Sequence, residues 1–234
     1  MSLIALIPAR GGSKGIPRKN IKSFCGKPLI YWSIKVALEN KLIDRVIVST
    51  EDKEIAQIAK DFSAEVPFLR SEALANDDSL TIDVVLNILE KLDDVTDILL
   101  LQPTSPLRRI EDLSSIFELR KKCSSDSAVS VCQSEKNLAL YQEIDPKRRL
   151  KPLLKGEKIL PRQFSKMKYL INGSMYLSSK ESIIKNKSLI TSNTVGYIMP
   201  EIFSIDIDNQ LDWDIGEFLM KKNMKKIFSN NNVA

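Results

Sequence analysis

Histidine is absent from this 234-residue chain. That absence excludes histidine triads, histidine metal sites and histidine general bases, so any catalysis relies on other groups. The three cysteines, Cys25, Cys123 and Cys132, are scattered without metal-binding spacing. They fit a reducing compartment, and we expect a cytoplasmic protein.

Long hydrophobic runs and nucleic-acid-binding motifs are also missing. The longest apolar runs are too short to span a bilayer, and no signal-peptide pattern precedes the first strand-like segment. Aromatic residues make up only 6% of the chain, although its net charge is +5. Part of this excess lies in a lysine-rich tail at residues 221–226. We therefore expect an anionic small substrate, with neither a membrane nor a nucleic acid as partner.

Glycine is scarce, but three of the eight glycines lie together near the N-terminus. Residues 3–7 form an apolar run typical of a strand buried on both faces, and the loop after it contains Gly11, Gly12 and Gly15. The same loop carries four cations, which are Arg10, Lys14, Arg18 and Lys19. Because ligands bind at the carboxyl ends of strands in open α/β sheets, we interpret this loop as a polyphosphate cradle. It has neither Walker A nor G-x-G-x-x-G spacing.

Strand and helix patterns alternate along most of the chain. We expect strands at residues 3–7, 44–49, 65–69, 96–101, 128–132, 169–177, 195–199 and 203–207. Helices are expected after Pro28 and at residues 52–62, 79–91, 111–122, 180–185 and 209–222, the third capped by Asp77 or Asp78 and the last burying Ile215, Phe218 and Leu219. This order predicts a doubly wound, mostly parallel sheet in one domain at 1–222. Residues 134–170 form an excursion from the sheet, and residues 223–234 a frayed tail.

Two aspartates near the end of the chain are metal-ligand candidates. Asp206 and Asp208 are two positions apart, so in an extended segment both side chains share a face. Beside a phosphate loop, such a pair suits Mg²⁺ held against substrate phosphates. The alternative is a turn before the last helix, with Asp208 as its N-cap.

Several motifs together resemble the acylneuraminate cytidylyltransferases, the CMP-sialic acid synthetase group. They are IPARGGSKGIPRKNI, the segment containing Arg70, Leu74, Ala75 and Asp77, LQPTSPLR, RQ followed by NG, and SIDID followed by DW. The resemblance covers about residues 3–220. It implies a three-layer α/β/α Rossmann-like nucleotide-diphospho-sugar transferase fold, in which the excursion at 134–170 makes a homodimer contact.

The resemblance also implies a reaction and a set of roles. CTP would react with the anomeric hydroxyl of a nine-carbon 2-keto sugar acid, with Mg²⁺ as cofactor and pyrophosphate as the leaving group. By matching position, Ala9, Arg10, Gly11, Lys19, Asn20, Arg70, Ser79 and Thr81 bind the nucleotide, Gln102, Arg162, Gln163, Asn172 and Gly173 face the sugar acid, and Asp206 and Asp208 hold the metal. Arg10, Lys19 and Asp208 are the catalytic candidates.

Three other functions remain open at this point. A related nucleotidyltransferase would use a sugar 1-phosphate with UTP, GTP or dTTP. A regulator would bind CTP without releasing pyrophosphate. A nucleic-acid-binding protein is suggested by the net charge alone.

Overall fold

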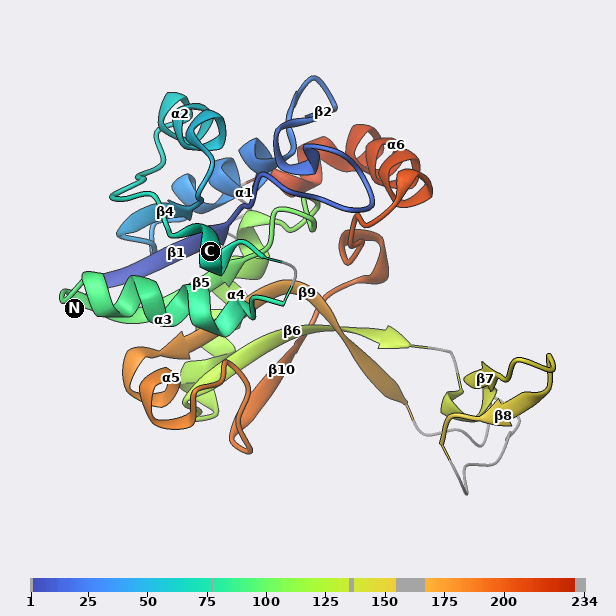
Figure 1. Cartoon of the computed structure of the whole chain (residues 1–234). Coiled ribbons are helices and arrows are strands. Elements are labelled where there is room, and N and C mark those ends of the chain that lie inside the picture. Colours follow the sequence, from blue (N-terminus) through green and yellow to red (C-terminus); the bar gives the residue numbers. More distant parts are fainter. Residues whose placement is uncertain (1, 77, 135–136, 155–166, 230–234) are drawn as a thin grey trace.

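The computed structural model describes residues 2–76, 78–134, 137–154 and 167–229. Its centre is a six-stranded sheet (Figure 1) in the order β10 (Thr194–Ile198), β6 (Ser127–Ser134), β9 (Lys168–Ser179), β5 (Val95–Leu101), β1 (Ser2–Pro8) and β4 (Arg45–Ser49). Neighbouring strands are parallel except at β9, which runs antiparallel to both β5 and β6. The carboxyl ends of β1, β4 and β5 therefore meet at one edge of the sheet.

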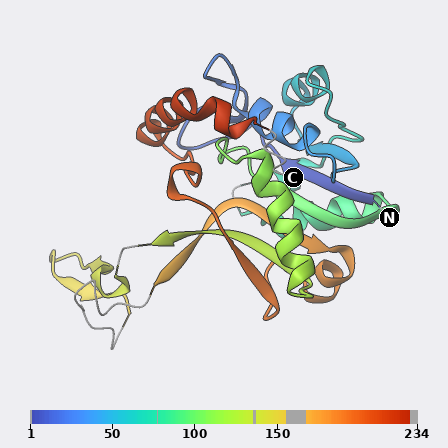
Figure 2. The same cartoon turned by 180° about the vertical axis from the view of Figure 1, so that it is seen from behind.

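Side chains alternate between the two faces of β1, and helices cover both faces (Figures 1 and 2). Ile4 and Leu6 belong to the apolar cluster of the face covered by α3 (Thr81–Lys91) and α5 (Lys180–Asn186). Ala5 and Ile7 belong to the other cluster, to which α1 (Leu29–Leu38), α2 (Lys53–Asp61), α4 (Ile110–Lys122) and α6 (Gln210–Ile227) contribute. This confirms the mostly parallel, three-layer fold predicted from the sequence.

Strands β6 and β9 extend beyond the sheet as a two-stranded ribbon. Past its tip lies a separate hairpin of β7 (Gln142–Ile144) and β8 (Leu150–Pro152), well away from the body of the molecule (Figures 1 and 2). We call it the distal hairpin. In the described ranges, the other short elements are β2 (Ser23–Phe24), β3 (Lys27–Pro28) and the 3-10 helices η1 (Lys19–Ile21), η2 (Glu72–Leu74), η3 (Leu138–Leu140) and η5 (Glu201–Phe203). In the described residues the chain leaves the sheet at the end of β6 and returns to it with β9.

Two expected strands and one expected cap are corrected by the structure. Residues 65–69 form no strand beyond a single bridge between Glu65 and Ile47. Residues 203–207 form no strand: Phe203 ends η5, and residues 204–207 are irregular chain in which the N–H of Ile207 donates to Thr104 of a loop and not to a strand. Helix α3 begins after Leu80 without a side-chain cap, so Asp78 does not cap it, and Asp77 lies outside the described residues.

Helix α6 is longer than the sequence predicted, and its buried face differs. It ends at Ile227 and not at Lys222, so the expected frayed tail begins as helix. Its buried positions are Trp213, Gly216, Met220, Asn223 and Ile227, whereas Ile215 and Phe218 are exposed and Leu219 is half-buried. The last turn packs on the core because Phe228 contacts the ring of Trp32 at 5.7 Å between centroids. Among the described residues, no helix is long and apolar enough to cross a bilayer.

Replacing Ile227 with alanine tests the packing of this last turn. The side chain is fully buried, so Ile227→Ala should lower the free energy of unfolding by about 2–4 kcal/mol. Leu211→Ala on the same helix removes a side chain that is 67% exposed and should change stability by less than about 0.5 kcal/mol. Urea denaturation measures both. Equal, small effects would show that the last turn does not pack as described.

Candidate active site

A cleft of about 400 Å³ lies at the carboxyl ends of β1 and β5. Three chain segments and one aspartate line it. The first segment contributes Pro8, Arg10, Ser13, Lys14, Gly15, Lys19 and Asn20, the second Arg70, Leu74, Asn76, Ser79, Thr81 and Val84, and the third Gln102, Pro103 and Thr104, with Asp208 completing the wall. Four cations therefore face one carboxylate, which gives the cleft a charge suited to a polyanion.

The glycine loop is fixed to its surroundings by Asn20 and Lys19. Asn20 is buried, and its amide donates to the backbone oxygen of Arg10 at 2.9 Å. The Lys19 ammonium donates to the backbone oxygen of Ile207 at 2.6 Å and lies 3.1 Å from the Asp208 carboxylate. An ammonium has three N–H donors, so Lys19 keeps one donor beyond these two contacts. Lys19 thus connects the loop to the segment that carries Asp208.

Gly15 lies against that same segment at very short range. A β-carbon added at Gly15 would be 2.1 Å from the backbone oxygen of Asp208. Real β-carbons do not approach backbone atoms this closely, so only glycine allows the contact. Gly12, in the same loop, would have nothing within 4 Å of an added β-carbon. The close contact with Asp208 is therefore made by Gly15, whereas a β-carbon at Gly11 would instead meet the Asp52 carboxylate at 2.5 Å.

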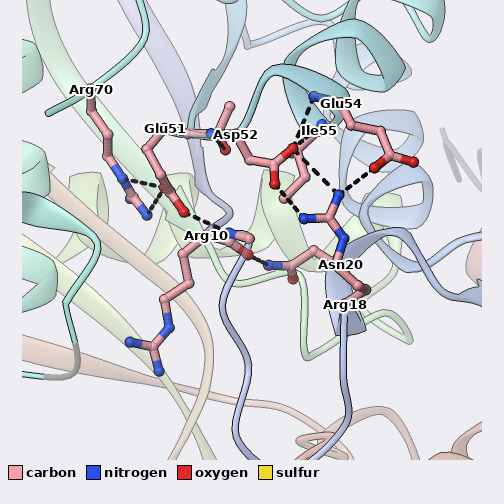
Figure 3. Close-up of polar contacts among 10 residues, drawn as sticks. Arg10, Arg18, Asn20, Glu51, Asp52, Glu54, Ile55 and Arg70 are labelled. Atoms are coloured by element: carbon pink, nitrogen blue, oxygen red, sulfur yellow. Dashed lines mark hydrogen bonds and ion pairs between the residues drawn. The ribbon is translucent and has the colours of Figure 1, made fainter. Parts of the chain in front are cut away.

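Arg18 does not belong to the cleft, although the sequence predicted four cations around the anion. Its backbone is left-handed, with φ of 54°, and its guanidinium pairs with Asp52 and with Glu54, the latter at 2.5 Å (Figure 3). The Arg18 bond lowers the pKa of Asp52, although burial opposes it. Asp52 also caps α2 by accepting from the N–H groups of Glu54 and Ile55. Arg18 therefore fixes the loop to α2.

Glu51 joins the glycine loop to Arg70 (Figure 3). One carboxylate oxygen accepts from the Gly11 N–H at 2.7 Å, and the other accepts from Arg70 at 2.9 and 3.1 Å. The Gly11 amide is thus occupied by Glu51, and Ala9 is fully buried with its N–H donating to Ser49. Neither residue lines the cleft, so their roles in nucleotide binding stay predictions. Arg10 does line it, and one of its contacts is the backbone oxygen of Asn76 at 3.3 Å.

The second wall combines apolar side chains with hydroxyl groups. Leu74 ends the short helix η2, and Val84 projects from the first turn of α3. Thr81 begins α3, and the Ser79 hydroxyl donates to the backbone oxygen of Ala73 at 2.9 Å. Both hydroxyl residues line the cleft, and their role in nucleotide binding stays a prediction. Such a wall suits a flat, partly polar group better than a phosphate chain.

The loop after β5 positions the two metal-candidate aspartates. The Thr104 backbone oxygen accepts from the N–H of Ile207 at 2.8 Å, between Asp206 and Asp208. Burial raises the pKa of Asp206 above its usual range, and the Asp208 carboxylate raises it further, while a Thr104 hydrogen bond and the charge of Lys19 oppose the rise. The Asp206 side chain still touches solvent, yet the surrounding protein removes part of its hydration.

The carboxylates of Asp206 and Asp208 are better suited to binding a divalent cation together than to remaining without one. Two like charges separated by one residue disfavour each other, and a bound Mg²⁺ would remove that repulsion. In the described part of the chain, no group of three His, Cys, Asp or Glu residues is arranged to hold a metal. Asp206 and Asp208 could thus supply two oxygen ligands, with substrate oxygens and water as the others.

Among the described residues, Arg108 has the largest fully buried side chain, and it supports the loop after β5 from within the core. It donates to the Ser33 hydroxyl at 2.7 Å, to the Ser174 hydroxyl at 3.2 Å and to the backbone oxygen of Gln102. Burial lowers its pKa to about 9, and the charges of Asp112 and Asp206 oppose this. The guanidinium is therefore charged at neutral pH, in contact with neutral groups.

Removal of Arg108 should be costly for stability. Arg108→Ala leaves a cavity and unpaired polar groups, so the free energy of unfolding should fall by about 3–5 kcal/mol. Arg149→Ala, which removes a largely exposed arginine from the distal hairpin, should change it by less than about 0.5 kcal/mol. Chemical denaturation measures both, and equal stabilities would contradict a supporting role for Arg108.

The predicted sugar-side residues are only partly assembled in the described chain. Gln102 lines the cleft, and its side chain oxygen would lie 2.6 Å from a β-carbon added at Gly173, whose φ is 73°. Asn172 is buried, bonded to Ser130 and Ser204, and does not line the cleft. Arg162 and Gln163 lie outside the described residues. These sugar-side roles stay predictions.

Sequence reasoning missed Glu51 and the structural role of Arg108. The helix expected from residue 52 concerns Asp52, which caps α2, and no role was assigned to Glu51. A carboxylate just past the end of a buried parallel strand is the signal that would have identified Glu51, since β4 ends two residues before it. For Arg108, a loop motif gave no indication that its arginine is buried.

Comparison with known proteins identifies one family and relatives with related names. The chain matches a family described as "Cytidylyltransferase" over residues 4–230. It is 36% identical over 240 residues to the CMP-N,N'-diacetyllegionaminic acid synthase of Legionella pneumophila, covering 97% of this chain and 100% of that protein. It is 32% identical over 215 residues to the N-acylneuraminate cytidylyltransferase of Streptococcus agalactiae, covering 91% of this chain and 52% of that protein. The chain thus spans the whole of the first relative and about half of the second.

Solved structures agree on the fold. The chain is similar to CMP:2-keto-3-deoxy-manno-octonic acid synthetase complexed with CTP, with a TM-score of 0.72 and 15% identity, over 95% of this chain and 100% of that chain. It is also similar to 4-diphosphocytidyl-2C-methyl-D-erythritol synthase from Anaerococcus prevotii, with a TM-score of 0.64 and 14% identity, over 94% and 98% of the two chains. At these identities the likeness shows the fold alone.

Proposed function

The chain belongs to the cytidylyltransferase family, as its motifs predicted, and we propose that it transfers CMP from CTP to the anomeric hydroxyl of a nine-carbon 2-keto sugar acid. Pyrophosphate is the other product. The observation that carries this proposal is the cleft itself, where Arg10, Lys19 and Arg70 face Asp208 at the carboxyl ends of the central strands. A triphosphate needs such a set of cations, and the transfer needs a carboxylate-held metal nearby.

Charge neutralisation is the main task of the side chains in this reaction. The sugar hydroxyl attacks the α-phosphorus, and the bond to the pyrophosphate oxygen breaks opposite to it. Negative charge then develops on the phosphate oxygens. Arg10 and Lys19 donate to these oxygens, while the loop after β5 holds the reacting groups in line. The apolar wall at Leu74 and Val84, with the Ser79 and Thr81 hydroxyls, accommodates the cytidine.

The metal belongs to the same proposal. Members of this family typically use a divalent metal. In this chain Asp206 and Asp208 would hold it, and Asp208 lines the same cleft as Arg70. When bound, Mg²⁺ would neutralise phosphate charge and favour deprotonation of the attacking hydroxyl. Thr104 and Lys19 keep the two carboxylates in place.

Among the described residues predicted to face the sugar acid, Gln102 is the one that lines the cleft. Gly173 leaves room beside it, because any larger residue would collide with the Gln102 amide. Arg162, with Gln163, is proposed as the partner of the acid's carboxylate, since Arg pairs with a carboxylate through two parallel bonds. Asn172 supports this end through its bonds to Ser130 and Ser204.

Among nine-carbon acids, N,N'-diacetyllegionaminic acid is the first candidate, because a relative named for it matches both chains over nearly their full lengths. The test is pyrophosphate release from CTP with Mg²⁺ and, in turn, the legionaminic, sialic and pseudaminic acids. Release with one acid and not with UTP would establish the reaction and its substrate. CTP binding without release for any acid would favour a sugar-1-phosphate enzyme or a regulator.

We also propose a homodimer that forms through the distal hairpin. Exposed apolar side chains gather on it and beside it, at Leu138, Leu140, Tyr141, Ile144, Leu150 and Leu153. An apolar surface of this kind on a projecting element is typical of a protein interface. Light scattering should give the mass of two chains, and Ile144→Lys should lower it. A fully active monomer at nanomolar concentration would contradict the proposal.

A further inference from the structure

We propose that Glu51 is a positioning residue for the nucleotide site, holding Arg70 and the glycine loop in the arrangement that receives a triphosphate. This inference rests on the proposed function. Glu51 lies two residues past the end of β4 and joins two segments that are far apart in the sequence. Its side chain is only 14% exposed, so its carboxylate acts inside the protein and not at the surface.

The two oxygens of Glu51 serve different donors. One accepts from the backbone N–H of Gly11, which fixes the path of the loop between Arg10 and Lys19. The other accepts from Nε and Nη2 of Arg70 (Figure 3). Arg70 lines the cleft, and among the described residues its Nη1 group has no partner. The carboxylate therefore holds one edge of the guanidinium and leaves the other edge for a ligand.

Charge explains why a carboxylate is needed at this position. The Arg70 side chain is 3% exposed, and burial lowers its pKa, while the charge of Glu51 raises it and the charge of Arg10 lowers it. Without Glu51, two cations would face each other at the cleft with no anion bound. Glu51 compensates Arg70 in the empty site, so the binding arrangement exists before the nucleotide arrives.

A role in helix capping does not account for Glu51. The start of α2 is capped by Asp52, whose carboxylate accepts from the N–H groups of Glu54 and Ile55. Arg18 fixes the loop to the same helix through Asp52 and Glu54. Glu51 instead bonds to Gly11 of the glycine loop and to Arg70, which lines the cleft. The geometry thus separates a structural residue, Asp52, from a positioning residue, Glu51.

The decisive variant is Glu51→Gln, because an amide offers one acceptor oxygen where the carboxylate offers two. Either Gly11 or Arg70 then loses its partner. We expect the Kd for CTP, measured by calorimetry, to rise about 10- to 100-fold. The KM for CTP should rise with it, while kcat at saturating CTP should change less than about threefold, since Arg70 binds ground state and transition state alike.

Glu54→Gln is the matched control. It removes the same charge three residues along the chain, from a side chain that is 66% exposed and pairs with Arg18. We expect less than about a twofold change in the Kd for CTP, since exposed pairs contribute little. An equal loss of affinity in both variants would indicate a general charge effect and overturn the positioning role.

A second measurement does not depend on turnover. Hydrogen exchange of the Gly11 amide should be at least about tenfold faster in Glu51→Gln than in the wild type, because that amide loses its acceptor or its fixed environment. Unchanged exchange together with wild-type CTP affinity would overturn the inference. A lower kcat and a lower melting temperature with unchanged Kd would also overturn it, since these mark a purely structural role. Failure of the wild type to bind CTP would instead remove the proposed function, and the inference with it.

Discussion

Gly15→Ala is expected to lower kcat/KM for CTP by about 100-fold or more. The new β-carbon would be 2.1 Å from the backbone oxygen of Asp208, so either the glycine loop or the Asp208 segment must shift. Lys19 connects these two segments, and both line the cleft. A shift of about 1 Å in a reacting group is enough for a loss of this size. Steady-state pyrophosphate release measures it.

Gly12→Ala is the control for this prediction. An added β-carbon there meets nothing within 4 Å, so activity should stay within about threefold of the wild type, as for surface changes away from a site. The two variants add the same methyl group to the same loop. If both lost activity equally, the loop would act through its flexibility, and the contact with Asp208 would not matter.

Asp208→Asn is expected to reduce kcat by about 100- to 1,000-fold. The amide keeps the shape of the side chain and one oxygen for Lys19, so the loss reports the missing negative charge. With that charge removed, the Mg²⁺ concentration for half-maximal activity should also rise, because Asp206 would be the remaining carboxylate. A titration of activity with Mg²⁺ after chelation of trace metal measures both effects.

Asp214→Asn provides the comparison for Asp208. It removes the same charge from the first turns of α6, where the carboxylate is exposed and accepts from Gln210 at 2.7 Å. Activity and Mg²⁺ dependence should stay within about twofold. Full turnover of Asp208→Asn in saturating Mg²⁺ would contradict the metal assignment, and the two aspartates would then be better explained as turn residues.

The sequence was sufficient for the sheet and for the family. Strands β1, β4 and β5 were predicted because buried parallel strands read as unbroken apolar runs. The family followed from ordered motifs near strand ends, and the comparisons confirm it. The predicted strand at 203–207 was wrong because its apolar residues Phe203 and Ile207 enter the core without strand pairing: Phe203 ends η5, and the N–H of Ile207 donates to a loop oxygen of Thr104.

The partners of charged side chains were less predictable from the sequence than the helices and strands. Arg10, Arg18 and Lys19 look alike in the sequence, but a left-handed backbone and two carboxylates on α2 take Arg18 out of the cleft. The prediction of which face of α6 is buried was also wrong. A helix that is polar on most sides gives a weak hydrophobic periodicity, so its orientation is decided by packing on Phe24 and Trp32. Which carboxylate pairs with which cation depends on contacts between distant segments, as for Glu51 and Arg70.

The most direct test of the central claim is a crystal structure of the protein grown with CTP and Mg²⁺. The account predicts the triphosphate in the cleft, within hydrogen-bond distance of Arg10 and Lys19, with the cytosine toward Ser79 and Thr81. Metal density should lie at Asp206 and Asp208. A nucleotide bound elsewhere, such as in the groove between α2 and residues 66–69, with the cleft empty, would contradict the account.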